Sequence, residues 1–454
     1  MTCRAFCLAS LLLLHSAAHA ALTFRVHADT VNTPGANSQN TPSSSSSDMQ
    51  VVLGDSYLSV QTEKQIQIYD FAKRRRIEID RAARSYTDYS LYDTVGFRTA
   101  ELRNRAFISQ MLAAAKTAAQ VGTPVDDQHA LSVLPAPAAL AEQGTAAAAP
   151  AEPRLERAES DGAARYSVAG AELLRASTQG TAVGAADAAR FAQFLRYQFG
   201  GHPLVLRQLE QQASIPARLA FHHRTIWGDS ERTLAISGVA EAPAQAAAYD
   251  LSGYSKRMAA QPALEQLLDQ AGGGQFGAQA KQRKLAADRL QAFADKRGME
   301  AMLITSEQTF VNGEFPGRAT PEQLAIIQND PDYRLLGGAV QVREKAKLQA
   351  AIATLRELRT KTERPYVLKV FEANHHLALG DRKTAIGLFI EALQANPHMA
   401  SVYKDLGDAL LLSYDTPQAW RCWDIGRQLA PGFVNFRSVN DFEASLAKNY
   451  PEYF

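Results

Sequence analysis

The chain has 454 residues, of which 46% are hydrophobic, and a formal net charge of +1 at pH 7. This length supplies material for two or more domains with buried cores. The near-zero charge argues against nucleic acid as a partner, because nucleic-acid-binding domains carry a basic surface. We therefore expect a multidomain globular protein that does not bind nucleic acid.

The first twenty residues have the pattern of a secretory signal peptide. Arg4 precedes a short apolar run, and Ala18-His19-Ala20 supplies the small-residue cleavage site before Ala21. The run is too short to span a bilayer, which takes ~20 apolar residues, and no later stretch is long enough. The alanine-rich composition suggests a high-GC bacterial source. We therefore expect cleavage after Ala20, no membrane span and a periplasmic location, with secretion to the medium as the alternative.

Cysteine usage predicts a structural thiol. Cys3 and Cys7 leave with the signal, so Cys422 is alone in the mature chain and cannot form an intrachain disulfide. It falls on an apolar helical stripe, where a thiol behaves as a small hydrophobe. A hydrophobic core must supply the stability that disulfides often give to exported proteins.

The N-terminal half indicates a sheet with helices. Residues 21–48 are rich in Ser, Thr, Asn and Pro, so we predict a disordered lead. Strands are expected over 49–92, because Ile66 and Ile68, and then Ile77 and Ile79, alternate with polar residues. A helix is predicted over 98–120.

Beyond this helix, residues 121–161 are dominated by Ala, Pro, Gln and Glu. They form either an interdomain linker or a long excursion inside one domain, and we favour the excursion. Strand patterns return over 166–173, 217–227 and 233–240, and a helix fits 185–199. The order predicts one sheet-plus-helix domain over 49–255.

Three short runs in this half carry a family resemblance. Ile68-Tyr69-Asp70-Phe71, Ile77-Glu78-Ile79-Asp80 and Ala83-Arg84-Ser85-Tyr86-Thr87 resemble the opening hairpins of LolA-like half-barrel domains of exported bacterial proteins. The segment from Ile215-Pro216 to Tyr249-Asp250-Leu251 is similar to the way such domains close. The resemblance implies a curved antiparallel sheet around one or more helices, with room for an apolar ligand.

A helical joint is expected over 256–341. Gly272-Gly273-Gly274 indicates a hinge, since it lacks the Lys-Ser/Thr of a phosphate loop. Thr320-Pro321-Glu322 is typical of a helix start. A long helix is predicted over 342–360, where Ala351 shares the phase of the repeats that follow.

The C-terminal region contains two copies of a pattern, 34 residues apart. Small and bulky residues recur at matching places, and Gly380 with Asp381 marks the end of one helix and the cap of the next. The matched pairs are Ala373 and Gly407, Ala385 and Ala419, Phe389 and Trp423, Ala392 and Gly426, and Pro397 and Pro431. The spacing and residues resemble tetratricopeptide (TPR) repeats, helix–turn–helix modules that bind other proteins.

Other residues that could carry chemistry fit structural roles better. The adjacent pairs His222-His223 and His375-His376 cannot converge on a metal, because neighbouring side chains diverge on a strand or a helix. Asp126-Asp127 with His129 lies in low-complexity sequence without a scaffold. Lys73-Arg74-Arg75-Arg76 could bind anionic lipid or peptidoglycan, but a solvated turn is favoured. No cofactor, metal or catalytic residue is predicted.

The sequence thus predicts an α+β protein with an N-terminal antiparallel sheet with helices and a C-terminal all-α, TPR-like solenoid over 342–454. A capping helix is expected at about 440–448. The predicted function is an exported, non-enzymatic scaffold that binds a protein or peptide on the concave surface of the first helices. Two alternatives stay open: a carrier of a lipid or lipidated protein in the half-barrel, and an envelope hydrolase. The candidate binding residues are Lys369, His376, Tyr403 and Leu410.

Overall fold

The computed structural model describes residues 21–34, 41–97, 154–168, 170–225, 228–242, 248–257, 264, 266–267, 278–313 and 315–454. Four sequence predictions lie outside these residues: the signal peptide, the helix over 98–120, the Asp126-Asp127/His129 cluster and the Gly272–Gly274 hinge. Most of the Ala/Pro-rich excursion also lies outside them.

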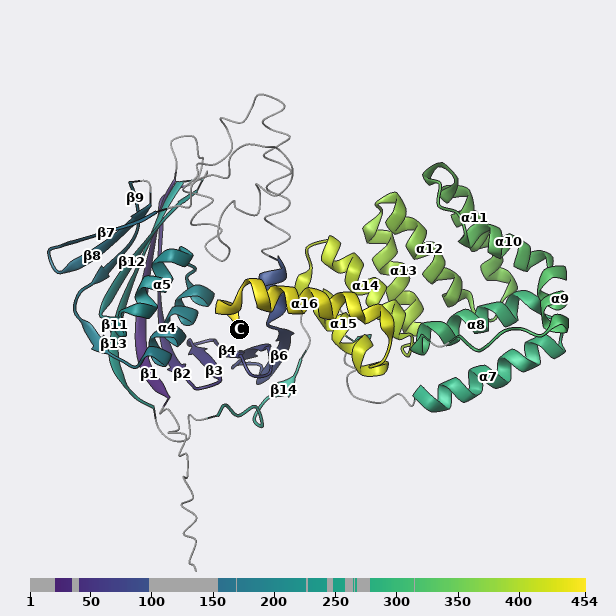
Figure 1. Cartoon of the computed structure of the whole chain (residues 1–454), viewed down its shortest axis with the longest axis horizontal. Coiled ribbons are helices and arrows are strands. Elements are labelled where there is room, and N and C mark those ends of the chain that lie inside the picture. The colour runs from purple at the N-terminus through teal and green to yellow at the C-terminus, as the bar shows by residue number, and fades with distance from the viewer. Residues whose placement is uncertain are drawn as a thin grey trace, which may run out of the picture.

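The chain is an α+β protein, as predicted, with a sheet in its N-terminal half and helices in its C-terminal half (Figure 1). The strands β1 to β14 form a twelve-stranded sheet in the order β14-β6-β5-β4-β3-β2-β1-β13-β12-β9-β8-β7, and β10 pairs with β11 separately. Neighbours run antiparallel except β14, which is parallel to β6. The bounds are β1 Leu22–Pro34, β2 Ser43–Leu53, β3 Tyr57–Gln61, β4 Gln65–Asp70, β5 Arg75–Asp80, β6 Ser85–Ser90, β7 Leu155–Ser160, β8 Ala163–Val168, β9 Ala171–Ser177, β10 Gly180–Ala182, β11 Ser214–Pro216, β12 Arg218–Thr225, β13 Gly228–Glu241 and β14 Ser255–Lys256.

The hairpins β4–β5 and β5–β6 share one turn construction. Asp70 Oδ1 accepts a hydrogen bond from the Lys73 backbone N–H at 2.8 Å, and Asp80 Oδ1 accepts one from the Ala83 N–H at 2.8 Å. Each turn then ends on an arginine in the left-handed region, with φ 57° at Arg74 and 49° at Arg84. Such aspartate-initiated turns imitate a backbone turn and place the next strand in register.

The prediction of a disordered lead over 21–48 was wrong. β1 is a central strand between β2 and β13, and Phe24, Val26 and Ala28 are buried on one face. The serines from Ser43 onward are exposed but extend β2 through backbone pairing with β1, from Ser43 opposite Asn32. Serine-rich sequence therefore forms a strand here because a long neighbour supplies the backbone partners.

The predicted excursion over 121–161 also needs correction at its end, because β7 pairs with β8 over residues 155–168. The predicted helix at 185–199 is confirmed as α4, Ala185–Gln198, which is followed by α5, Pro203–Gln211. Both helices lie inside the curve of the sheet (Figure 1). Phe191 and Phe194 pack edge-on against Phe24, with ring centroids 5.9 and 5.6 Å away.

The C-terminal half is a succession of helices. Their bounds are α7 Ala278–Ala294, α8 Gly298–Asn312, α9 Pro321–Asn329, α10 Pro331–Val340, α11 Leu348–Leu358, α12 Pro365–Leu379, α13 Arg382–Ala395, α14 Ala400–Leu412, α15 Thr416–Leu429 and α16 Arg437–Asn449. The predicted boundary is confirmed at Gly380, which has φ 88° at the end of α12, and at Asp381, whose side chain accepts the Thr384 N–H at 3.2 Å. The helix predicted over 342–360 is shorter, with a 3-10 turn on each side of α11.

The 34-residue pattern is a packing repeat in space. Phe389 and Trp423 on the second helices α13 and α15 are buried, at 0% and 2% exposure. Ala373 and Gly407 occupy the matching places on the first helices α12 and α14, and both are buried. A Cβ atom added to Gly407 would lie 2.3 Å from Trp423 Nε1, so the bulky ring requires a glycine opposite it. Of the other matched residues, the alanines and Gly426 are buried, Pro397 is partly exposed and Pro431 is exposed.

The array contains a unit that the sequence reading placed in the joint. Ala339 on α10 and Leu355 on α11 lie 34 residues before Ala373 and Phe389, and both are buried. The hairpin α10–α11 therefore precedes α12–α13 and α14–α15 in the same phase. The start of the array moves from residue 342 to Pro331, and α16 takes the place of a following first helix.

Two strong contacts join the array to the sheet. Arg75 on β5 binds Asp88 on β6 and Asp424 on α15, each at 2.7 Å. Trp420 on α15 is fully buried and packs on Gly96, where an added Cβ would lie 2.3 Å from the ring. The chain ends beside α4 (Figure 1).

Candidate functional site

Two of the four predicted binding residues cannot contact a partner. Tyr403 and Leu410 are buried, at 0% and 1% exposure, so this prediction was wrong for them. They lie on the side of α14 that packs into the array, as do Lys369 and His376 at the equivalent places on α12, 34 residues earlier. The error arose because helical periodicity alone does not say which side of a first helix faces its neighbours.

The other two predicted residues have partners within the array. His376 is 7% exposed, and its Nδ1 lies 3.0 Å from a carboxylate oxygen of Asp381, the cap of α13. The side chain of Lys369 is 27% exposed and pairs with Glu391 at 2.9 Å. Lys369 is the only one of the four with a substantial exposed side chain.

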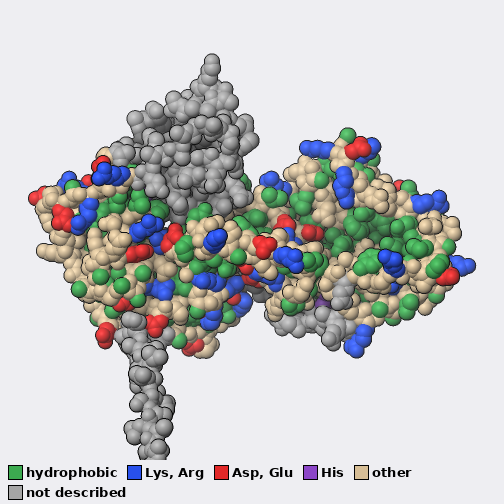
Figure 2. Space-filling model, viewed as in Figure 1, with side chains coloured by type: hydrophobic (Ala, Val, Ile, Leu, Met, Phe, Trp, Pro, Cys, Tyr) green, Lys and Arg blue, Asp and Glu red, His purple; other side chains and the backbone are tan. Residues whose placement is uncertain are grey.

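A different stripe of the first helices reaches solvent. Phe371 and Asn374 on α12 and Lys404, Asp405 and Asp408 on α14 are exposed or partly exposed, and we call them the first-helix face. Phe371 and Asp405 are equivalent in the repeat, and so are Asn374 and Asp408. Hydrophobic side chains also gather on the helical half of the molecule (Figure 2). The spacing of i, i+3 and i+4 could have identified this stripe once the repeat phase was known.

The polar groups of the first-helix face are electrostatically coupled. Lys404 Nζ lies 2.6 Å from Asp408 Oδ2. Burial raises the pKa of Asp405 to about 7, and the charge of Asp408 acts in the same direction, while Lys404 and a hydrogen bond with Asn374 oppose it. Near neutral pH this carboxyl is therefore divided between a form that donates a hydrogen bond and a form that only accepts.

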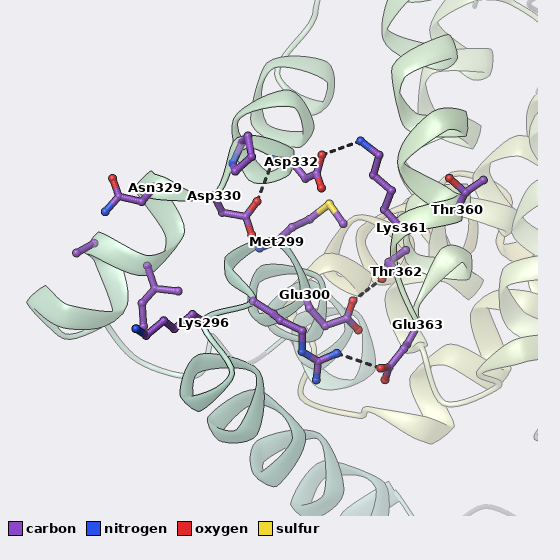
Figure 3. A pocket seen from close by; sticks show the side chains of 14 residues that line it. Lys296, Met299, Glu300, Asn329, Asp330, Asp332, Thr360, Lys361, Thr362 and Glu363 are labelled. Atoms are coloured by element: carbon purple, nitrogen blue, oxygen red, sulfur yellow. Dashed lines mark hydrogen bonds and ion pairs between the residues drawn. The ribbon is translucent and has the colours of Figure 1, made fainter.

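The second candidate is a pocket of about 870 Å³ at the start of the array (Figure 3). It lies between the N-terminus of α8, the corner from α9 to α10, and residues 360–363 before α12. Asp330 shapes this corner: its Oδ1 accepts the Asp332 and Tyr333 N–H groups at 2.9 and 3.2 Å, and its Oδ2 accepts the Met299 N–H at 2.8 Å.

Charged side chains pair across the pocket. Lys361 Nζ lies 2.9 Å from Asp332, Arg297 lies 3.0 Å from Glu363, and Thr362 Oγ1 donates to Glu300 at 2.5 Å (Figure 3). The residues that line it include no histidine, cysteine or serine that could act as a nucleophile or a base near neutral pH. These pairs fasten α8 and α10 to the start of α12, which is a structural role.

Directly beneath the pocket, Arg364 is the centre of a buried ion cluster. Its guanidinium binds Glu300 at 2.7 Å, Asp288 at 2.8 Å and Glu307 at 3.0 Å, and Glu307 also accepts from Asn396 at 2.5 Å. Burial by itself would lower the pKa of Arg364, but the bond to Glu300 and the charge of Glu307 outweigh it and raise the pKa. The cluster joins α7, α8, α12 and the end of α13.

The remaining candidate residues have structural environments. His375 is buried, with Nε2 2.9 Å from the Ala339 carbonyl oxygen, and His222 lies near Glu172 and Glu231 on the sheet. Cys422 is fully buried. Within the described residues, no group of three or more His, Cys, Asp or Glu side chains could hold a metal ion.

The basic run from Lys73 to Arg76 is not a solvated patch. Lys73 pairs with Asp70 at 3.1 Å, Arg75 bridges Asp88 and Asp424, and Arg76 pairs with Asp93 at 2.9 Å. The run therefore helps to join the sheet to the array, and the favoured interpretation as a simple solvated turn needs that correction.

None of the helices in the described part of the chain is both long and apolar enough to cross a membrane. No protein-family model matches the chain, and no curated protein matches it.

Proposed function

We propose that the protein is an exported, non-enzymatic scaffold that binds a segment of a partner protein on the first-helix face of TPR-like repeats. The observation that carries the proposal is the regular array of three helical hairpins whose first helices leave one polar stripe open to solvent. Packing consumes the other sides of these helices, so the stripe is available for recognition. The leader supports a periplasmic location.

The stripe suits an extended polypeptide. Asn374 is exposed and can donate and accept, as a peptide backbone requires, and the side chain of Asp408 is 43% exposed. Asp405 adds a carboxyl that can donate or accept near neutral pH, while Phe371 supplies an apolar contact beside the polar groups. Affinity in such a surface comes from a few buried contacts with a polar rim.

The alternatives have less support. A carrier would need an apolar chamber in the sheet domain, whereas rings from α4 contact Phe24 on β1 directly. An envelope hydrolase would need a nucleophile beside a base, and the lining of the pocket in Figure 3 offers neither.

The proposal can be tested by quantitative capture from an extract of the exported compartment. The bait is the mature protein, compared with a face variant, Asn374→Arg with Asp408→Arg, and with a control, Gln394→Arg, on the exposed side of α13. We expect a partner that the wild type and the control retain and the face variant loses. Equal capture by all three baits, at equal folded fraction, would refute the proposal. Copurified lipid in native mass spectrometry would favour the carrier.

A further inference from the structure

The chain continues past α16 onto the sheet domain. A 3-10 turn, Pro451–Tyr453, follows α16 and brings residues 451–454, which we call the strap, against α4 (Figure 1). Tyr453 is completely buried there. The strap and α4 are about 256 residues apart in the sequence.

Three side chains on one side of α4 recognise the backbone of the strap. Arg196 Nη1 donates to the Glu452 carbonyl oxygen at 2.9 Å, and Gln193 Nε2 donates to the same oxygen at 3.3 Å. Tyr197 Oη donates to the Tyr453 carbonyl oxygen at 2.8 Å. Residues 193, 196 and 197 share a helix side because they are three and four apart. Arg196 is only 5% exposed, so this is a built site rather than a surface contact.

Two aromatic side chains add selectivity to these backbone contacts. The Tyr453 ring lies edge-on to Tyr197 at 5.6 Å and under the Arg196 guanidinium at 5.2 Å. Phe454 packs on Tyr92 at 4.8 Å and under Arg74 at 5.2 Å. The site therefore reads two consecutive carbonyl groups and two consecutive rings.

The strap is also a tie between the two halves of the molecule. On the array side, α16 is fixed to α15 because Arg427 binds Glu443 at 2.8 Å and Asp424 at 2.7 Å. On the sheet side it holds α4. Loss of the strap would leave the Arg75–Asp424 pair and the Trp420 contact to hold the array in place.

We propose that the strap side of α4 is a peptide-binding site for a Tyr-Phe segment, filled by the chain's own residues 451–454, and that it works as a releasable clasp between the array and the sheet. A free segment of the same chemistry competes with the strap. When it displaces the strap, the array gains freedom to move relative to the sheet. The proposal does not depend on the function proposed above.

The first test measures peptide binding in trans. A fluorescent peptide with the sequence of residues 449–454 is titrated into the full chain and into a variant lacking residues 452–454. We expect saturable binding to the shortened variant and binding about tenfold or more weaker to the full chain, because a tethered occupant competes at an effective concentration of ~1 mM. A peptide with Tyr453→Ala serves as the control and should not bind. Equal binding of both peptides, or no binding to a folded shortened variant, would overturn the proposal.

The second test does not rely on the shortened variant. Spin labels at Lys64 and Lys383, both exposed, report the distance between the sheet and the array. We expect Arg196→Met in the full chain to broaden the distance distribution, and the exposed α5 variant Arg207→Met to leave it unchanged. A narrow, unchanged distribution in Arg196→Met would show that the strap is not a clasp.

Discussion

Gly407 offers the sharpest test of the repeat packing. An added methyl at this place in α14 would lie 2.3 Å from Trp423 Nε1 and 3.0 Å from the Ala419 carbonyl oxygen. Trp423 is 2% exposed and donates Nε1 to the Lys404 carbonyl oxygen at 3.3 Å, so the ring cannot move aside without losing a hydrogen bond. Overpacking of this kind costs about 1–3 kcal/mol.

Helix propensity acts in the opposite direction. Replacing glycine by alanine in a helix interior gains about 0.8–1.0 kcal/mol. The steric cost is larger, so we expect Gly407→Ala to lower the free energy of unfolding by about 1–2 kcal/mol. Gly387 on α13 is the matched control, since nothing lies within 4 Å of its added Cβ. Gly387→Ala should be neutral or stabilising by up to about 1 kcal/mol.

Urea unfolding followed by tryptophan fluorescence and circular dichroism measures both variants against the wild type. The difference between them should be about 2 kcal/mol, which such titrations resolve. If Gly407→Ala is as stable as Gly387→Ala, the close approach of α14 and α15 is not as described, and the phase of the repeat is wrong.

Three further changes test the array. Phe389→Ala or Trp423→Ala removes a buried ring at a cost of about 3–5 kcal/mol, so limited proteolysis should cut the array while the sheet domain persists; wild-type resistance would contradict this. Arg364→Ala leaves buried carboxylates without their cation and should cost about 3–5 kcal/mol in urea unfolding; a loss below about 1 kcal/mol would contradict the cluster. The raised pKa of Asp405 means that the wild type loses stability as pH rises from 3.8 to about 7, because the folded form holds the proton more tightly. Asp405→Asn should flatten that slope in urea unfolding, and an unchanged slope would contradict it.

The sequence allowed the array to be predicted because its packing is local. Small residues such as Ala373 and Gly407 and bulky ones such as Phe389 and Trp423 recur at a fixed period, and period survives in sequence. The unit α10–α11 was missed because Leu355 stands where the later units have an aromatic ring. The binding residues were misassigned because Tyr403 lies on the packed side of α14, which only the neighbouring helices define.

Long-range pairing explains the other errors. β1 is a strand because it lies between β2 and β13, with Leu22 opposite both Leu53 and Glu241, and local composition contains no trace of the second partner. The strap was likewise invisible, since Tyr453 meets Tyr197 across 256 residues. Hairpins such as β4–β5 were predictable because both strands and their turn lie within one short segment.

The most direct test of the scaffold proposal places a photo-crosslinking amino acid at Asn374, on the first-helix face, and at Gln394, on the exposed side of α13, in the exported protein. We expect a discrete crosslinked partner from position 374 that is absent from position 394 and is lost when Asp408→Arg is added. The same adducts from both positions, or no adduct from either, would contradict the proposal that this face binds a partner.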